Sequence, residues 1–129
     1  MFRLVKVLNG NNQCDIFKIK SSVTASIIPG CALVCSNGAL ANATATVCPD
    51  YVALGKDTKE KGIIDAMVVT EDMIFKVEYT GTTVPYVGMA VSLSTGKYKM
   101  DSVTNNSSGK GVILALEDDK KLVHVRFRK

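Results

Sequence analysis

The chain has 129 residues, which is enough for one domain with a hydrophobic core of its own. Hydrophobic residues make up 47% of it and charged residues 22%, so the composition is that of a globular protein and excludes a disordered one. No apolar stretch approaches the roughly 20 residues that a membrane helix needs. The N-terminal segment lacks the long apolar run of a secretory signal, so we expect an intracellular product with no membrane partner.

The balance of charge is mildly basic. Sixteen Lys and Arg against twelve Asp and Glu give a net charge of +4, while aromatic residues are only 6% and tryptophan is absent. Nucleic-acid-binding domains concentrate basic charge and use aromatic rings for stacking, so we expect no specific nucleic-acid partner. One local excess of positive charge lies at Lys120, Lys121, Arg126, Arg128 and Lys129. We interpret it as the solvated face of a final strand or as a contact to an acidic partner.

Apolar and polar residues alternate with a period of two along much of the chain, as they do in half-buried β-strands. The clearest case is Leu122 to Arg128, where Val123, Val125 and Phe127 share one face. Strands are expected, in chain order, at residues 2–8, 14–19, 31–34, 51–54, 63–69, 73–79, 89–93, 111–116 and 122–128. No segment predicts a helix. The pattern predicts an all-β fold, a small single-domain β-barrel or β-sandwich of short antiparallel strands that spans residues 1–129.

Turn-forming residues separate these strands. The strongest hairpin signals are Asn9-Gly10 and Asn37-Gly38, because both residue types tolerate positive φ. Each dipeptide is expected to join the strand before it to the strand after it. Glu71-Asp72 is expected to be another turn between consecutive strands.

Two stretches depart from this rhythm. Residues 21–49 contain no charged side chain, although about six would be expected at the average of the chain. The stretch is interpreted either as a subunit interface or as a sheet that is packed on both sides within one chain. Residues 101–110 are polar and rich in Asn and Ser, which predicts an exposed, flexible loop.

The four cysteines, Cys14, Cys31, Cys35 and Cys48, include no Cys-x-x-Cys pair. Structural zinc sites normally use such short pairs, and disulfides need an oxidising compartment. We interpret the cysteines as small buried hydrophobic residues, with zinc ligation and disulfide formation as the alternatives.

The sequence contains few residues that could support catalysis. The single histidine, His124, lies on the outward side of its expected strand, so a nucleophile–base arrangement would depend on it alone. The carboxylates at 71–72 and 117–119 fall in expected turns and lack the spacing of a calcium-binding loop. The sequence therefore predicts a non-enzymatic protein with no catalytic residue, no cofactor and no metal site.

A series of strand and turn motifs runs through most of the chain. They are Ile28-Pro29-Gly30-Cys31-Ala32-Leu33-Val34, Cys48-Pro49-Asp50-Tyr51-Val52-Ala53-Leu54, a strand over 64–69 with a hairpin into Phe75-Lys76-Val77-Glu78-Tyr79, Val87-Gly88-Met89-Ala90-Val91, Gly109-Lys110-Gly111-Val112-Ile113-Leu114 and Val125-Arg126-Phe127. In this ordered pattern the chain resembles the decoration (cement or auxiliary head) proteins of tailed-phage capsids.

The resemblance implies a mechanical role. Such a protein would be made in the bacterial cytoplasm, bind the major capsid protein on the outside of the virion, and stabilise the shell, with a homotrimer as the favoured oligomer. In this picture residues 1–6 form an N-terminal arm that adds to a neighbour. The candidate interface residues are Met1, Phe2, Arg3, Arg126, Arg128 and Lys129.

Two other functions remain open at this point. A different virion component, such as a tail or head-completion subunit, would share the β-rich pattern but would occur in far fewer copies than the coat protein. An oligonucleotide-binding barrel would also have short strands and positive charge, and its binding would weaken steeply with salt.

Overall fold

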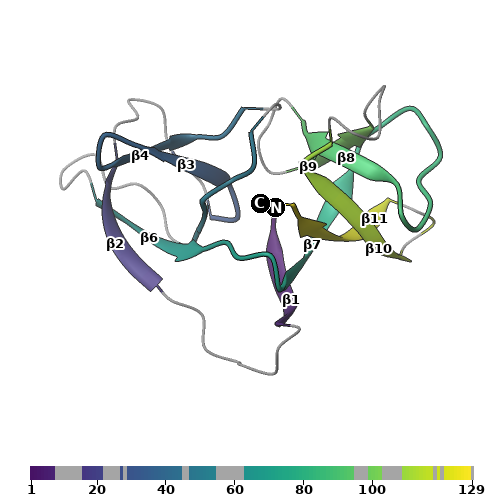
Figure 1. The fold of residues 1–129 in the computed structure, drawn as a ribbon, viewed down its shortest axis with the longest axis horizontal. Helices are drawn as coiled ribbons and strands as arrows, with labels where there is room; N and C mark the ends of the chain where they lie inside the picture. The colour runs from purple at the N-terminus through teal and green to yellow at the C-terminus, as the bar shows by residue number, and fades with distance from the viewer. Residues whose placement is uncertain are drawn as a thin grey trace.

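The computed structural model describes residues 1–7, 16–21, 27, 29–44, 47–54, 63–94, 99–102, 109–117, 119 and 121–128. All regular elements among them are strands, so the predicted all-β class is confirmed. The strands are β1 (Arg3–Val7), β2 (Ile16–Ser21), β3 (Ala32–Ser36), β4 (Ala39–Asn42), β5 (Tyr51–Ala53), β6 (Ile63–Val68), β7 (Met73–Tyr79), β8 (Ala90–Leu93), β9 (Lys99–Ser102), β10 (Gly111–Glu117) and β11 (Leu122–Phe127). They form two sheets, which lie beside each other in Figure 1. No helix that could span a membrane occurs in these residues.

Five short strands close into a small barrel in the order β2-β4-β3-β5-β6, with β6 pairing back to β2. Its pairings are antiparallel except for a short parallel one between β2 and β4. The β3–β4 hairpin turns at Asn37 and Gly38, whose φ angles are 52° and 76°. Two consecutive positive φ angles are typical of a type I′ turn, which matches the twist of the flanking strands. The hairpin predicted at this dipeptide is therefore confirmed.

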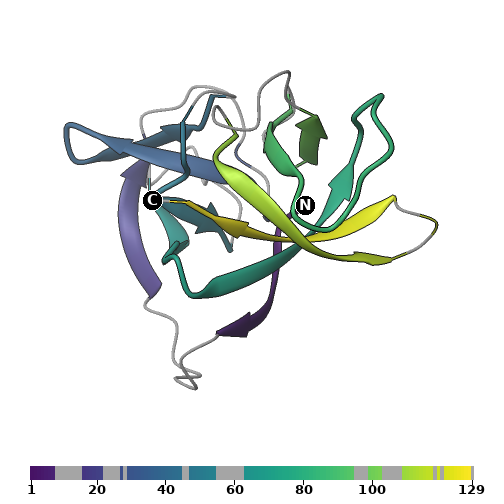
Figure 2. The same cartoon turned by 45° about the vertical axis from the view of Figure 1, so that its right-hand side comes forward.

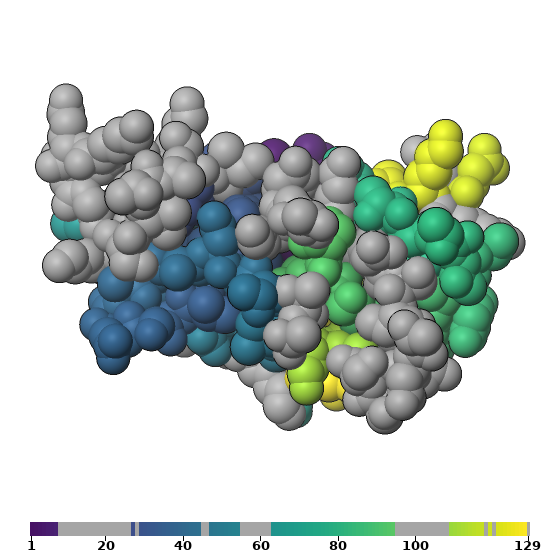
Figure 3. All heavy atoms as spheres, turned by 90° about the horizontal axis from the view of Figure 1, so that it is seen from above, coloured from purple at the N-terminus to yellow at the C-terminus, as the bar shows by residue number. Residues whose placement is uncertain are grey.

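The remaining six strands form the large sheet, in the order β1-β7-β11-β10-β8-β9. Strand β9 also pairs in parallel with the end of β7, at Glu78 and Tyr79, so the sheet curls back on itself. The β10–β11 hairpin is long and extends beyond the rest of the sheet in Figure 2. Seen from above, residues of the barrel strands β3 to β5, coloured blue, lie toward the left, and the green residues that follow β7 lie toward the right (Figure 3).

One hydrophobic cluster joins the two sheets. It contains Val52 and Met67 from the barrel together with Phe75, Val125 and other residues of the large sheet. A second, smaller cluster fills the barrel and consists of Ile27, Cys31, Leu33, Leu40, Ala53, Ile64 and Ala66. Because the larger cluster takes side chains from both sheets, the two sheets share one core and form a single small domain.

Residues 31–33, which belong to the uncharged stretch 21–49, lie between these two clusters. Cys31 and Leu33 point into the barrel, whereas Ala32 belongs to the cluster shared with the large sheet, and all three are buried. A strand that is buried on both faces has no room for a charged side chain. Of the two interpretations of residues 21–49, packing on both sides within one chain is what the structure shows at Cys31, Ala32 and Leu33, whereas Cys35 and Ser36 at the end of β3 are exposed.

The chain path differs from the expectation at three places. Asn9-Gly10 lies outside the described residues, and the expected hairpin is wrong, because β1 pairs with β7 whereas β2 pairs with β4 and β6. The turn expected at Glu71-Asp72 is confirmed, but it does not form the expected hairpin, since β6 and β7 belong to different sheets. Strand β9 includes Asp101 and Ser102, which were expected to begin the loop 101–110. Gly109 of that loop is buried against Ala90, and residues 103–108 lie outside the described part.

Candidate interaction surface

One face of the large sheet is in contact with solvent, and we call it the outer face. Along β7 the odd-numbered residues from Met73 to Tyr79 are buried in the core, while Ile74, Lys76 and Glu78 point the other way. Strand β11 alternates in the same manner. The period-two pattern in the sequence therefore predicted correctly which side of these strands is available to a partner.

Two rows of aligned residues cross the outer face. The first runs from Arg3 on β1 through Lys76 on β7 to His124 on β11. The second places Arg126 on β11 opposite Val112 on β10. Side chains aligned across neighbouring strands lie close together, so the outer face combines positive charge with aliphatic surface.

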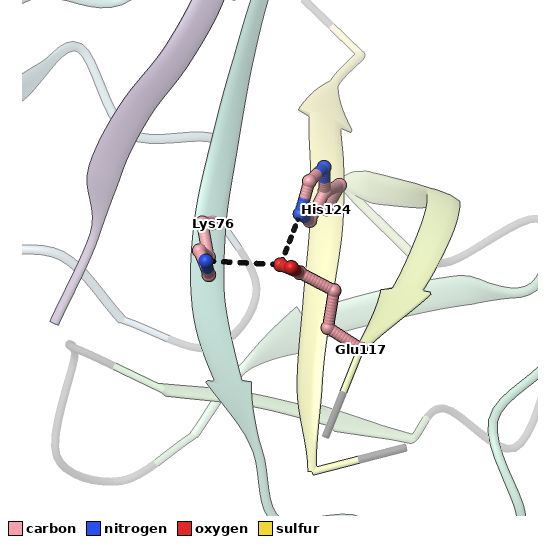
Figure 4. Close-up of polar contacts among 3 residues, drawn as sticks. All are labelled: Lys76, Glu117 and His124. Atoms are coloured by element: carbon pink, nitrogen blue, oxygen red, sulfur yellow. Dashed lines mark hydrogen bonds and ion pairs between the residues drawn. The ribbon is translucent and has the colours of Figure 1, made fainter. Parts of the chain in front are cut away.

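A polar cluster occupies the middle of this face (Figure 4). One carboxylate oxygen of Glu117, Oε2, lies 2.6 Å from His124 Nε2 and 3.0 Å from Lys76 Nζ. The hydrogen bond from His124, and next the one from Lys76, hold the pKa of Glu117 below its usual 4.5, because both stabilise the carboxylate. The three side chains come from three neighbouring strands, so the cluster ties β7, β11 and β10 together on their solvent side.

A groove of about 290 Å³ lies over β10 and the end of β11. It is lined by Val112, Leu114, Arg126, Phe127, Arg128 and, from the turn before β7, Glu71. Two predicted interface residues, Arg126 and Arg128, are thus brought to one concave site and are both exposed. We call this site the arginine groove.

A smaller groove of about 130 Å³ lies at the β1 side of the outer face. It is lined by Met1, Arg3, Lys76, Val77, Glu78 and Leu122. Two more predicted interface residues, Met1 and Arg3, therefore line a concave part of the same outer face as Arg126 and Arg128. Whether these four residues contact a partner stays a prediction.

The last two candidate interface residues are Phe2 and Lys129. Phe2 is only 3% exposed and lies in the core, where its ring contacts Phe75 and Phe127. Residues 3–7 pair with β7 of the same chain, so the segment expected to be a free arm is part of the large sheet here. Lys129 lies outside the described residues.

Metal-ligating side chains do not gather in the described residues. No set of three or more His, Cys, Asp or Glu side chains there is placed to hold a metal ion. Cys31 is buried, as expected for a small hydrophobic residue, but Cys35 is exposed and Cys48 is half-buried, and none of the three forms a disulfide. The backbone N–H of Cys35 donates to Asp50, which gives that carboxylate a structural role. Cys14 lies outside the described part of the chain.

Sequence reasoning missed several members of this surface. Leu114 is 38% exposed because it shares the outward side of β10 with Val112, whereas Gly111 and Ile113 are buried. The apolar run Val-Ile-Leu-Ala-Leu contains no polar residue that would mark which side of the strand faces solvent. The loop after β7 also presents Val84, Tyr86 and Val87, which are more than half exposed. The run Thr-Val-Pro-Tyr-Val could have indicated this apolar loop, since nothing in it is charged.

Comparisons with known proteins give a similarity of structure. No protein-family model matches the chain, and no curated protein matches it. Among solved structures, the crystal structure of the head fiber gp8.5 N base of bacteriophage phi29 is similar, with a TM-score of 0.63 and 16% sequence identity. The alignment covers 90% of this chain and 95% of that chain. At this identity the similarity establishes a shared fold.

Proposed function

We propose that this chain is a non-enzymatic structural protein of a phage particle, which binds the major capsid protein on the outside of the shell and stabilises it. The observation that carries the proposal is the fold shared with the phi29 head fiber base over 90% of this chain and 95% of the other. A match over nearly the full length of both chains favours a comparable mechanical role. The resemblance of the sequence motifs to capsid decoration proteins points in the same direction.

The outer face of the large sheet suits attachment to a shell. It combines exposed cations with aliphatic side chains, and such mixed surfaces are common in interfaces between folded proteins. A capsid repeats each contact many times, so individual contacts can be modest and still hold the shell together. We further propose a homotrimer, because decoration proteins often occupy threefold positions. On this proposal, the protein is made in the bacterial cytoplasm and added to the capsid exterior.

The direct test is quantitative mass spectrometry of purified particles from the source culture, with the major coat protein as the internal standard. A ratio to the coat protein near one, or a simple fraction of one, supports a shell-covering role. Particles made without this chain should then lose their genome at a lower temperature. Absence of the chain from purified particles would refute the proposal, and binding to DNA at low salt would then be measured instead.

A second candidate is the base of a fibre, or a tail or head-completion subunit. The specific observation in its favour is that the similar solved structure is itself the base of a head fiber. The same mass-spectrometric measurement separates the two candidates. A few copies per particle would favour a tail or completion subunit, whereas a peptide map that continues past Lys129 would favour a fibre base that carries a longer shaft.

A further inference from the structure

We propose that the arginine groove binds an extended acidic segment of a partner protein, with one apolar side chain next to two carboxylates. The inference rests on the proposed function only for the origin of that segment, which would be a loop or terminus of the coat protein. Everything else in it follows from the groove. Its lining residues are Glu71, Val112, Leu114, Arg126, Phe127 and Arg128.

The apolar part of the groove is built by β10. Val112 is half-buried and Leu114 is 38% exposed, because alternation along the strand places both on the side opposite the buried residues Gly111 and Ile113. The bulge between Ile113 and Ala115 interrupts the pairing with β11 at Leu114. Exposure of a leucine beside two arginines gives a partner an apolar contact next to a charged one.

The cationic part is built by the end of β11. Arg126 and Arg128 are two residues apart on an extended segment, since the N–H of Arg128 still donates to the carbonyl of Lys110 at 2.8 Å. Alternate residues of a strand are about 6.8 Å apart. Alternate side chains of an extended peptide have the same spacing, so two carboxylates at positions i and i+2 can each meet one guanidinium. Arginine binds carboxylates through paired hydrogen bonds, which gives such a contact direction as well as charge.

The order of the groups fixes the pattern of the ligand. Because Val112 is opposite Arg126, and Leu114 lies further along β10, the sequence along the groove is Leu114, Arg126, Arg128. An extended segment would therefore match it with an apolar, an acidic and a second acidic side chain at alternate positions. Glu71 also lines the groove and disfavours additional carboxylates near it. The groove has a volume of about 290 Å³, close to the lower limit of about 300 Å³ for small-molecule sites. A groove of this size can hold a few side chains of a partner.

The test uses the full chain and the capped peptides Leu-Ser-Glu-Ser-Glu and Glu-Ser-Glu-Ser-Leu, which present this pattern in the two chain directions. Methyl and guanidinium NMR signals are followed up to about 10 mM peptide, because a short flexible peptide loses entropy on binding. We expect saturable shifts at Val112, Leu114, Arg126 and Arg128 with at least one of the two peptides. Absence of such shifts with both peptides, or equal shifts with Leu-Ser-Lys-Ser-Lys, would overturn the proposal.

Variants locate the binding. The double variant R126E/R128E should weaken binding at least tenfold, and L114S should weaken it severalfold without any change of charge. Lys121→Glu is the matched control, because Lys121 is an exposed cation at the other end of β11 and lines neither groove. It should bind as the natural chain does. Unchanged binding by R126E/R128E, or by a folded L114S, would contradict the proposed site.

Particle assembly separates this inference from the proposed function. If the natural chain is present on particles while R126E/R128E is incorporated in the same copy number, the function stands and the docking site is wrong. If the natural chain is absent from particles, the proposed function fails, and the peptide titration alone decides whether the groove binds acidic segments.

Discussion

The backbone N–H of Phe2 donates a hydrogen bond of 2.9 Å to the carbonyl oxygen of Gly30, which connects the N-terminal end of the large sheet to the barrel. The N–H of Gly30 in turn donates to the carbonyl of Ala53 at 2.7 Å. The ring of Phe2 lies 5.6 Å from that of Phe127 and 6.2 Å from that of Phe75, centroid to centroid. The N-terminal residues therefore hold the two sheets together.

Replacement of Phe2 by alanine should destabilise the whole domain. The side chain is 3% exposed, and loss of a buried phenylalanine typically costs about 3–5 kcal/mol of unfolding free energy. Urea denaturation followed by circular dichroism measures the loss. Val5→Ala is the control, because Val5 is 48% exposed and its truncation should change stability by less than about 0.5 kcal/mol. Equal effects of the two substitutions would show that Phe2 is not part of the core.

Gly30 is predicted to tolerate no side chain. Its φ is +81°, and a Cβ there would overlap Met1 Cγ and come within 3.2 Å of the Phe2 nitrogen. Gly88 has a similar φ of +91° but open space around it, so Gly88→Ala isolates the backbone strain, about 1–2 kcal/mol. Gly30→Ala adds the steric overlap and should cost about 1–3 kcal/mol more. Thermal unfolding of both variants, side by side, checks the difference; equal losses would place Met1 and Phe2 away from Gly30.

The parts of the fold that follow from local alternation could be predicted from the sequence. Strands β7 and β11 were predicted with the correct buried sides, and Asn37-Gly38 was identified as a hairpin. The division into two sheets could not be predicted, because β1 pairs with β7 from far along the chain, and local pattern carries no information on such pairings. Strand β9 was missed for a related reason: Lys-Met-Asp-Ser shows little alternation, and its pairing partners define it as a strand.

The candidate surface was predicted in part. Arg126 and Arg128 were identified from the excess of charge near the end of the chain, and the structure places both in one groove. Leu114 lies in an apolar run with no polar residue to mark its outward side, and the contribution of Glu71 depends on a connection between the sheets, so neither could be identified from spacing. Phe2 was selected for its position near the start of the chain, but its apolar side chain is buried.

The carboxyl group of Glu117 should titrate at a lower pH than an ordinary glutamate. Hydrogen bonds from His124 and, secondarily, from Lys76 lower its pKa from 4.5 in the folded chain. Carbon-detected NMR titration of the side chain measures this midpoint. His124→Gln should move the midpoint toward the ordinary value, and Lys76→Gln should move it less. A midpoint at or above 4.5 in the natural chain would contradict the polar cluster.

The same shift makes a prediction about acid stability. Because the pKa of Glu117 is lower in the folded than in the unfolded chain, its stabilising contribution is present above the unfolded value and is lost as the pH falls through the folded value. Glu117→Gln should therefore lower the melting temperature at pH 5, and the difference from the natural chain should shrink as the pH falls below about 4.5. The effect should be small, since the group is exposed. A difference that grows on acidification would show the opposite sign of shift.

The hairpin between β3 and β4 offers a test of turn chemistry. Asn37 and Gly38 both have positive φ, which a β-branched residue adopts only with strain. Asn37→Val should lower the unfolding free energy by about 1–2 kcal/mol, whereas Asn37→Gly should change it by a few tenths, because glycine adopts this conformation freely. Asn37 is exposed, so the two substitutions do not change a contact in the core. Chemical denaturation measures the unfolding free energies of the two variants. Equal values would mean that the turn does not constrain the hairpin.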